Sequence, residues 1–366
     1  MSGPGYVLAD RSPDSWQQAG GGQHRTTQLH EILRDAGIEI RHVPAEADCS
    51  NLRKYALGLK YFLPLGLRHR SSLRCVRRHG AVAARLHKAF AASREATVLL
   101  WEDTHRARQA TPLIARQAGL AVVALPHNLE ALVAFPPGTR LRATSRRWRE
   151  EVRHLGAVSA AFCCSREEQW LLALYGVAAD FLPCFPPQSV AGHCLRIRER
   201  RQTMRPQRLL IMGSASYAPT FDGMARLLEM LRRLPGGGRL PVDVAGFGSE
   251  AFRPHLEGTD YVLHGAVDAE ALAHLLVHAK AVLLHQTAGG GALTRIPEML
   301  LAGVPVLANP IAARSAMQLD GVHVCDSEKD LACWLNSELS PPPLPARPRN
   351  AEARLVETVR RLMGRA

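Results

Sequence analysis

The residues best suited to chemistry lie in a glycine-rich segment in the second half of the chain. Gly289, Gly290 and Gly291 follow a strand-like apolar run and precede a helical pattern that contains Arg295 and Glu298. Glycines before a helix let a phosphate approach backbone N–H groups and the positive end of the helix dipole. Because Arg295 and Glu298 are three positions apart, they share one helix face. The pattern predicts an arginine on a diphosphate and a carboxylate on ribose hydroxyls; a flexible turn with a surface ion pair is the alternative.

Polar side chains also follow an apolar run in the first half. His127, Asn128 and Glu130 come after the run at 121–125, and three polar groups at a strand end suit a polyhydroxylated ligand. An imidazole at this place can donate a hydrogen bond to a sugar hydroxyl or help to move a proton. A loop histidine that is hydrogen-bonded to backbone is the alternative.

A second strand end carries a similar group. Glu102, Asp103 and His105 close the apolar run at 97–101, so they too can face a ligand. Such residues also cap helices, and a helical pattern starts near His105, so capping is the other interpretation. Near the start of the chain, a glycine triplet at 20–22 precedes Arg25, which we expect to meet either phosphate or solvent.

The elements that position these residues alternate between short apolar runs and helical patterns. This alternation is typical of βαβ units with parallel sheets, in which ligands bind beyond the carboxyl ends of the strands. The strand-like runs lie at 6–9, 38–43, 97–101, 121–125, 160–164, 208–212, 241–245, 261–264, 281–285 and 304–308. The clearest helical stretches lie at 26–36, 106–118, 221–233, 269–278 and 294–302.

Interruptions in the alternation divide the chain. The pattern lapses around 186–208, which we interpret as a linker, and a proline-rich spacer at 341–348 precedes a final amphipathic helix. We therefore predict an α/β protein with a Rossmann-like domain at 1–190, a second at 191–340, and a spacer with its helix at 341–366.

The run from Gly289 to Ala308 resembles the donor-binding segment of GT-B glycosyltransferases, in the large group of retaining bacterial enzymes known as glycosyl transferases group 1. Its ending, Glu298-Met-Leu-Leu-Ala-Gly-Val-Pro-Val, is the most specific part. The resemblance spans about 6–320 and is stronger in the second domain. Other stretches that fit, in order, are 20–25, 126–130, 165–168, 212–214, 219–223, 245–248 and 264–265.

The resemblance implies two domains that face each other across a cleft, with the last helix crossing back to the first domain. It implies a metal-independent, retaining transfer of sugar from a nucleoside-diphosphate-sugar, without other cofactors, to a saccharide or lipid-linked acceptor, as in polysaccharide biosynthesis. The implied catalytic residues are His127 and Glu130, and the acceptor side holds Glu102, Asp103, His105 and Asn128. The implied donor-binding residues are Gly21, Gly22, Arg25, Gly213, Ser214, Gly246, Gly248, Gly289, Gly290, Gly291, Arg295 and Glu298.

One departure from the family pattern leaves the donor sugar open. Many relatives carry two glutamates eight positions apart; Glu298 is the second of these, and Gly290 stands at the place of the first. Separately, a nucleotide-sugar epimerase on the same fold is a further enzyme alternative. The chain contains no D-x-D pair, no P-loop and no G-x-S-x-G motif. Gly246 and Gly248 lack the third glycine of a dinucleotide fingerprint.

The basic excess is concentrated in one stretch. The chain carries 46 Lys+Arg against 33 Asp+Glu, and 49–94 holds eleven cations and no acid. Apolar residues flanked by cations in the Arg53–Arg94 region suit a helix lying on an anionic membrane, whereas an ordinary amphipathic helix is the alternative. A second basic run at 140–149 can equally be a solvated helix face. Nucleic-acid binding is the other open function, although aromatics make up only 5% and no reading motif is present.

The remaining signals concern compartment. The eight cysteines form no C-x-x-C pair, so we expect reduced, mostly buried thiols. Residues 1–10 lack a signal-peptide pattern, and no run approaches the roughly 18 apolar residues of a spanning helix. We expect a soluble, cytoplasmic protein, with peripheral binding to the inner face of the membrane as an extension of that prediction.

Overall fold

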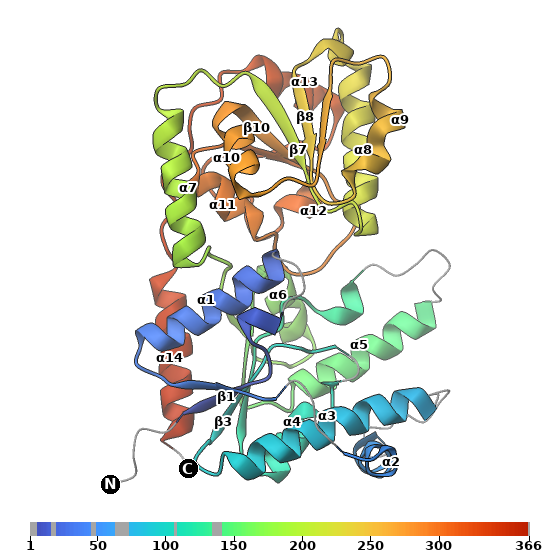
Figure 1. Cartoon of the computed structure of the whole chain (residues 1–366), viewed down its shortest axis with the longest axis vertical. Helices are drawn as coiled ribbons and strands as arrows, with labels where there is room; N and C mark the ends of the chain where they lie inside the picture. The colour runs from blue at the N-terminus through green and yellow to red at the C-terminus, as the bar shows by residue number, and fades with distance from the viewer. Residues whose placement is uncertain are drawn as a thin grey trace. The chain divides into compact units, whose positions relative to one another are not determined.

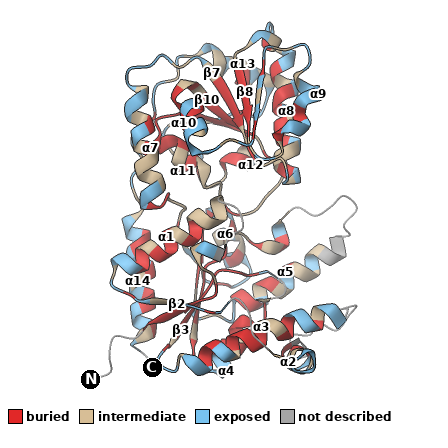
Figure 2. Cartoon of the chain, in the orientation of Figure 1, coloured by how far each residue is buried: buried red, intermediate tan, exposed pale blue. Residues whose placement is uncertain are grey.

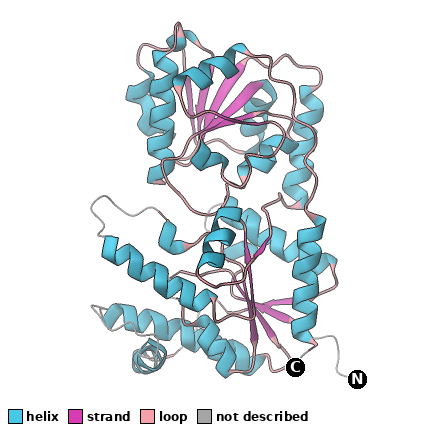
Figure 3. Ribbon diagram, turned by 180° about the vertical axis from the view of Figure 1, so that it is seen from behind, coloured by secondary structure: helices cyan, strands magenta, loops and turns pink. Residues whose placement is uncertain are grey.

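The structure is a computed structural model that describes residues 6–15, 20–44, 49–62, 73–105, 108–133 and 141–364. The chain divides into two compact units (Figures 1 and 3). Unit 1 comprises Met1–Pro183 together with Pro348–Ala366, and unit 2 comprises Cys184–Arg347. The last helix therefore belongs to unit 1, as the predicted crossing requires.

Unit 1 is built on a parallel sheet in the order β2-β1-β3-β4-β5-β6. Its strands are β1 (Val7–Ala9), β2 (Ile40–His42), β3 (Val98–Trp101), β4 (Ala121–Ala124), β5 (Ala160–Cys163) and β6 (Asp180–Phe181). Its helices are α1 (Gly21–Asp35), α2 (Asn51–Phe62), α3 (Leu73–Ala92), α4 (Thr111–Gln117), α5 (Leu141–Leu155), α6 (Arg166–Leu174) and α14 (Arg349–Met363), with short 3-10 turns η1 (Pro13–Ser15) and η3 (Glu130–Leu132).

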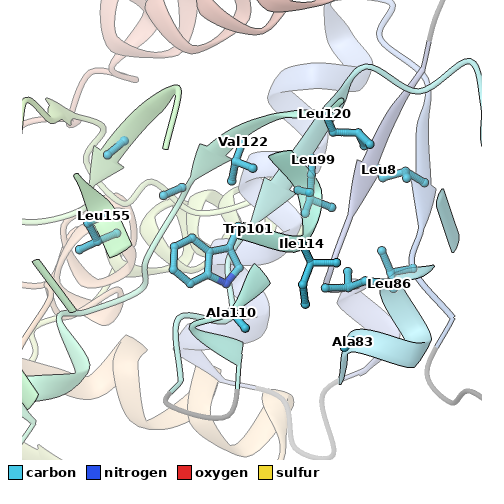
Figure 4. Close-up of a cluster of buried hydrophobic side chains, with 14 of the residues drawn as sticks. Leu8, Ala83, Leu86, Leu99, Trp101, Ala110, Ile114, Leu120, Val122 and Leu155 are labelled. Atoms are coloured by element: carbon cyan, nitrogen blue, oxygen red, sulfur yellow. The ribbon is translucent and has the colours of Figure 1, made fainter. Parts of the chain in front are cut away.

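Helices cover both faces of the unit 1 sheet because its inner strands β1, β3, β4 and β5 are apolar at every position. Successive side chains of a strand point to opposite faces. Leu99 and Trp101 enter a core formed with α3 and α4, and Figure 4 shows Leu8, Leu99 and Trp101 in one cluster with Leu86 and Ile114. The other face of the sheet packs against α1 and α14, whose buried leucines share one cluster.

Unit 2 is built on a parallel sheet in the order β12-β11-β10-β7-β8-β9. Its strands are β7 (Arg208–Met212), β8 (Val242–Ala245), β9 (Val262–Gly265), β10 (Ala279–Leu284), β11 (Val306–Ala308) and β12 (Val322–Val324). Its helices are α7 (Gln188–Arg201), α8 (Ala218–Arg233), α9 (Arg253–Leu256), α10 (Ala269–His278), α11 (Arg295–Leu301), α12 (Pro310–Ala313) and α13 (Glu328–Asn336), with 3-10 turns η4 (Gly237–Arg239) and η5 (Ser249–Phe252). Its inner strands β7, β8, β10 and β11 are mostly buried on both faces, whereas the edge strands β9 and β12 are partly exposed (Figure 2).

The segment predicted as a linker is instead mostly the helix α7. Cys194 and Ile197 are buried in the unit 2 core. Arg198 donates from Nε to the carbonyl of Leu301, and Arg201 donates from Nε to the carbonyl of Gly303. The arginines of α7 therefore donate to carbonyls at the end of α11 and just beyond it. These contacts explain why a charged run with little apolar patterning is a helix here.

The order of the strands fixes where the loops diverge. β1 lies between β2 and β3, and β7 lies between β8 and β10. In each sheet the chain therefore adds strands first on one side of its first strand and then on the other side. Such switch points, at the carboxyl ends of the strands, are where open parallel sheets bind ligands. Each unit therefore has one predicted location for a site.

The basic stretch forms a pair of packed helices, α2 and α3. The pair is close enough that a Cβ added at Gly80 would lie 1.6 Å from the carbonyl oxygen of Lys54. Leu52, Leu59 and Leu73 are exposed on this pair. Residues 63–72, which include Arg68 and Arg70, lie outside the described residues, as does Arg140 of the second basic run.

Two predictions about the whole chain can be compared with the structure. All eight cysteines are free, and Cys163, Cys164, Cys194 and Cys325 are buried. Among the residues that the structure describes, no helix combines the length and the apolar character needed to cross a bilayer.

Candidate functional site

At the switch point of unit 1, a buried carboxylate links the first strand to the third. Asp10 directly follows β1, and its two oxygens accept hydrogen bonds from the backbone N–H groups of Glu102 (2.9 Å) and Asp103 (3.2 Å). Burial, followed by the charge of Glu102, raises the pKa of Asp10 to about 6, although the backbone hydrogen bond opposes this shift. Asp10 therefore fixes the path of the chain as it leaves β3.

Glu102 is the centre of a buried network. Its Oε2 accepts hydrogen bonds from the hydroxyl of Thr26 (2.7 Å) and from Nε2 of His127 (3.0 Å). Nε2 of His30 lies 3.5 Å from the other oxygen. Burial by itself would raise the pKa of Glu102, but the hydrogen bonds and charges of His127 and His30 outweigh it and hold the pKa at about 2. The carboxylate is therefore ionised at neutral pH.

The loop after β3 continues with a buried carboxylate that pairs with two arginines and with an exposed histidine that pairs with Glu130. Asp103 Oδ2 lies 2.9 Å from both Arg11 and Arg108, and the Asp103 side chain is buried. His105 is 70% exposed, and its Nδ1 lies 3.0 Å from Oε2 of Glu130. This hydrogen bond to Glu130 raises the pKa of His105, whereas its partial burial opposes the shift. His105 and Glu130 are thus the accessible members of this region.

Two buried carboxylates fix the loop that carries His127. Glu168 accepts a hydrogen bond from the backbone N–H of Leu129 (2.8 Å), and Glu151 accepts from those of Glu130 (2.8 Å) and Ala131 (2.7 Å). The pKa of Glu151 is raised to about 7, chiefly by burial. The His127 ring, which is 17% exposed, is therefore held on a rigid support.

Three sequence predictions change at this edge. Glu102 and Asp103 were expected to face an acceptor, but both are buried and bound to neighbouring side chains. Arg25 was expected to meet a diphosphate, but it is buried and donates to the carbonyls of Leu182 (2.8 Å) and Pro183 (3.1 Å). In each case a polar residue near a strand or helix end serves an internal contact.

Other predicted residues of unit 1 keep positions that a ligand can reach. Gly21 and Gly22 form the first turn of α1 and are partly exposed. His127 and Asn128 are partly exposed after β4. The side-chain oxygen of Asn128 is buried and has no hydrogen-bond partner among the described residues. Unit 1 therefore offers histidine, amide and carboxylate groups at one sheet edge.

At the switch point of unit 2, the loops after β7, β8 and β9 pack backbone against backbone. Gly246 N donates to the carbonyl of Gly265 (2.8 Å), and Ala215 N donates to that of Phe247 (2.8 Å). A Cβ added at Gly246, which has φ +128°, would lie 1.9 Å from the carbonyl oxygen of Gly213. These contacts bring the predicted residues Gly213, Ser214, Gly246 and Gly248 into one region.

The helix α11 brings its polar side chains to the same edge. Arg295 is half-buried, and it donates from a terminal guanidinium nitrogen to the carbonyl of Met212 (3.0 Å), the last residue of β7. Burial lowers the pKa of Arg295, and the charge of Glu298 opposes this shift. The structure therefore unites the first loop of the domain with Arg295, which lies about eighty positions further along the chain.

The glycine triplet is held by an arginine that sequence reasoning did not identify. Arg314 donates from Nε to the carbonyl of Gly291 (2.7 Å) and from a terminal nitrogen to that of Gly290 (2.5 Å). The carbonyl and the following N–H of a trans peptide point in opposite directions. The N–H groups of Gly291 and Ala292 therefore point away from Arg314.

A further network anchors Arg314. Its other terminal nitrogen donates to Oε1 of Gln286 (2.9 Å), and Nε2 of Gln286 donates to the hydroxyl of Thr220 (3.2 Å). Asn309 donates to the carbonyl of Gln286 (2.8 Å) and accepts from its N–H (3.0 Å). Arg314 and Asn309 belong to no recognisable sequence motif, so only the folded structure shows their role.

No family model and no curated protein matches the chain. Among solved structures, sucrose-phosphate synthase from Thermosynechococcus elongatus superposes with a TM-score of 0.60 at 15% identity, covering 98% of this chain and 97% of that one. The trehalose-phosphate synthase of Burkholderia xenovorans, in complex with glucose-6-phosphate, gives 0.62 at 14% identity and 98% coverage of both chains. Anabaena HepE with UDP-glucose gives 0.57 at 15% identity and the same coverage. The chain has the GT-B fold.

Within the described part of the chain, no three histidine, cysteine or acidic side chains gather closely enough to hold a metal ion. The ionisable groups of unit 1 are instead joined to one another and to backbone N–H groups. Each of the two Rossmann-like domains thus carries a different set of polar groups at its switch point.

Proposed function

We propose that this protein is a glycosyltransferase that moves a sugar from a nucleoside-diphosphate-sugar to an acceptor. The observation that carries the proposal is the arrangement at the unit 2 edge, where α11 places Arg295 beside Met212 and where Arg314 orients the glycine triplet. A cation and backbone N–H groups that converge at one edge suit a diphosphate. The GT-B fold supports the same conclusion.

The donor would bind in unit 2. Glu298 lies one helical turn after Arg295, so its carboxylate can accept hydrogen bonds from ribose hydroxyls while Arg295 and the loop N–H groups bind the diphosphate. The leaving diphosphate would then be stabilised by a guanidinium and backbone groups, so we propose a metal-independent reaction. Retention of configuration is proposed from the sequence resemblance.

Unit 1 would supply the groups around the sugar and the acceptor. His127 and Asn128 suit hydroxyl groups, and the exposed pair of His105 and Glu130 suits a polar acceptor. The structures of similar fold include one with UDP-glucose and one with glucose-6-phosphate, so these two compounds are the first donor and acceptor to test.

The test is binding of UDP, measured by thermal shift and by calorimetry. UDP is expected to raise the melting temperature of the wild type, and Glu298→Ala is expected to weaken binding about tenfold to a hundredfold, because a charged hydrogen bond contributes about 1.5–3 kcal/mol. Glu257→Ala, at an exposed site of the same unit, is the matched control. If neither UDP nor another nucleoside diphosphate stabilises the protein, the proposal fails. Product analysis without an acceptor would reveal an epimerase.

We also propose that the α2–α3 pair docks on an anionic membrane, where a lipid-linked acceptor would be found. Exposed leucines lie among cations in a stretch that contains no acid. Neutralising Arg74, Arg77 and Arg78 together should abolish flotation with vesicles that contain anionic lipid, because each cation contributes about 1 kcal/mol at such a surface. The control neutralises three exposed arginines of unit 2, Arg196, Arg226 and Arg253. Equal flotation of both triple variants would contradict docking through this pair.

A further inference from the structure

We infer that Glu102 is a positioning residue that holds His127 in a single tautomer, with the proton on Nε2 and with Nδ1 on the side of the ring away from the carboxylate. The geometric part of this inference stands by itself, and its catalytic consequence rests on the proposed function. It assigns to Glu102 a role different from the acceptor contact that the sequence suggested.

The donors and acceptors at Glu102 determine the tautomer of His127. An ionised carboxylate can only accept hydrogen bonds. The hydrogen bonds and charges of His127 and His30 outweigh the effect of burial and leave Glu102 ionised, with its pKa held at about 2. Both groups at Oε2 must therefore be donors, namely the Thr26 hydroxyl at 2.7 Å and Nε2–H of His127 at 3.0 Å. The neutral His127 ring then carries its proton on Nε2.

The second step is that the carboxylate cannot easily turn away. Its side chain is fully buried, and the backbone N–H of Glu102 is bound to Asp10. Thr26 and His30 are four positions apart on α1, so both lie on the helix face that meets Glu102. Residues at the ends of β1 and β3 and on α1 thus fix the position of the carboxylate to which His127 donates.

The third step concerns what His127 offers to a ligand. Any hydrogen bond that the ring makes to a ligand through nitrogen involves Nδ1, because Nε2 is bound to Glu102. Neutral Nδ1 is an acceptor, so the matching ligand group is a hydroxyl that donates its hydrogen. A sugar hydroxyl has this chemistry. Glu102 therefore determines the direction of the hydrogen bond at this point of the site.

The direct experiment is nitrogen NMR of the full-length protein with ¹⁵N-labelled histidine, in which His127→Gln identifies the signals of His127. The wild type is expected to show protonated Nε2 and unprotonated Nδ1 in the neutral ring. The isosteric Glu102→Gln should populate the other tautomer, since the amide can donate as well as accept. Glu39→Gln, at an exposed ion pair of the same unit, should leave the pattern unchanged. A wild-type ring with its proton on Nδ1 would overturn the inference without any variant.

A kinetic measurement tests the consequence. With UDP-glucose as the probe, Glu102→Gln should lower kcat for sugar release or transfer about 10–100-fold, with the KM for UDP-glucose changed less than about threefold. A positioned proton-transferring side chain contributes about 100-fold or more, and the wrong tautomer of His127 would forfeit part of that contribution. A matching rise in KM with unchanged kcat would show that Glu102 supports binding only and would contradict the positioning role. Absence of activity in the wild type would count against the proposed function, whereas the NMR result would still decide the tautomer.

Discussion

Both units are built on six-stranded parallel sheets, with different strand orders, and they fill their switch points with different chemistry. In unit 1, ionisable side chains gather there, and Asp10, Glu102 and His127 are joined by direct hydrogen bonds. In unit 2, the same place is built from glycines and backbone carbonyls, and the guanidinium of Arg314 contacts Gly290 and Gly291. Topology therefore fixes where each site lies, and the residues that follow the strands decide what it can bind.

The difference suits the two halves of a sugar transfer. Oriented backbone N–H groups bind a diphosphate without titrating near neutral pH, whereas carboxylates and imidazoles exchange protons and recognise hydroxyls. Substitutions at the unit 2 edge should therefore change the free energy of unfolding and the affinity for nucleotide. Changes at the unit 1 edge should affect proton-dependent properties.

The largest effect is expected from Gly246→Ala. The new Cβ would lie 1.9 Å from the carbonyl oxygen of Gly213, and the φ of +128° disfavours any side chain. We expect a loss of about 3–5 kcal/mol in the free energy of unfolding, measured by chemical denaturation. Gly238→Ala is the control, since its nearest neighbours would be 3.8 Å away, and it should change stability by less than about 1 kcal/mol. Equal effects would mean that the loops after β7 and β8 do not pack as described.

A smaller effect, which depends on pH, is expected from Glu151→Gln in unit 1. The folded pKa of about 7 lies above the ordinary value of 4.5, so the folded protein binds this proton more tightly than the unfolded chain. Relative to the variant, the wild type should lose about 3 kcal/mol of stability as the pH rises from 4.5 to 7 and nothing further above that window. Denaturation curves at pH 4.5, 6 and 8 measure this difference. A constant difference would show that Glu151 is not held in a buried, uncompensated environment.

The third expected effect is on nucleotide affinity. Arg314→Ala removes the donors that orient the glycine triplet, so the loop N–H groups lose their common direction. We expect UDP to bind about a hundredfold more weakly, which corresponds to about 2.7 kcal/mol. Arg226→Ala, at an exposed position of the same unit, is the matched control. The comparison between the units would fail if Arg314→Ala disturbed the His127 tautomer but left UDP affinity intact.

The sequence predicted most of both sheets correctly because their inner strands are mostly buried on both faces. Arg208–Met212 is a strand with the predicted bounds, and Ala269–His278 is a helix with the predicted bounds. The two-residue strand β6 and the half-exposed strand β12 were missed, because short or partly polar strands lack a continuous apolar run. The helix α7 was missed because its arginines bind carbonyls of the domain and do not mark a solvated linker.

At the site, sequence patterns located the strand ends but could not pair the groups. Glu102 and His127 were both identified, yet their contact depends on strands that lie side by side in the sheet. Thr26 and His30 are four positions apart, and that spacing was the available signal for a shared face toward Glu102. Arg314 lies far along the chain from the glycine triplet and in no motif, so no pattern of spacing could have assigned it.

The most direct test of the account is a crystal structure of the protein with UDP. The account predicts the diphosphate against the N–H groups of Gly291 and Ala292 and near Arg295, with the ribose hydroxyls on Glu298. UDP bound at the Asp10–Glu102 edge of unit 1, or on unit 2 without contact to Glu298 and the glycine triplet, would contradict it.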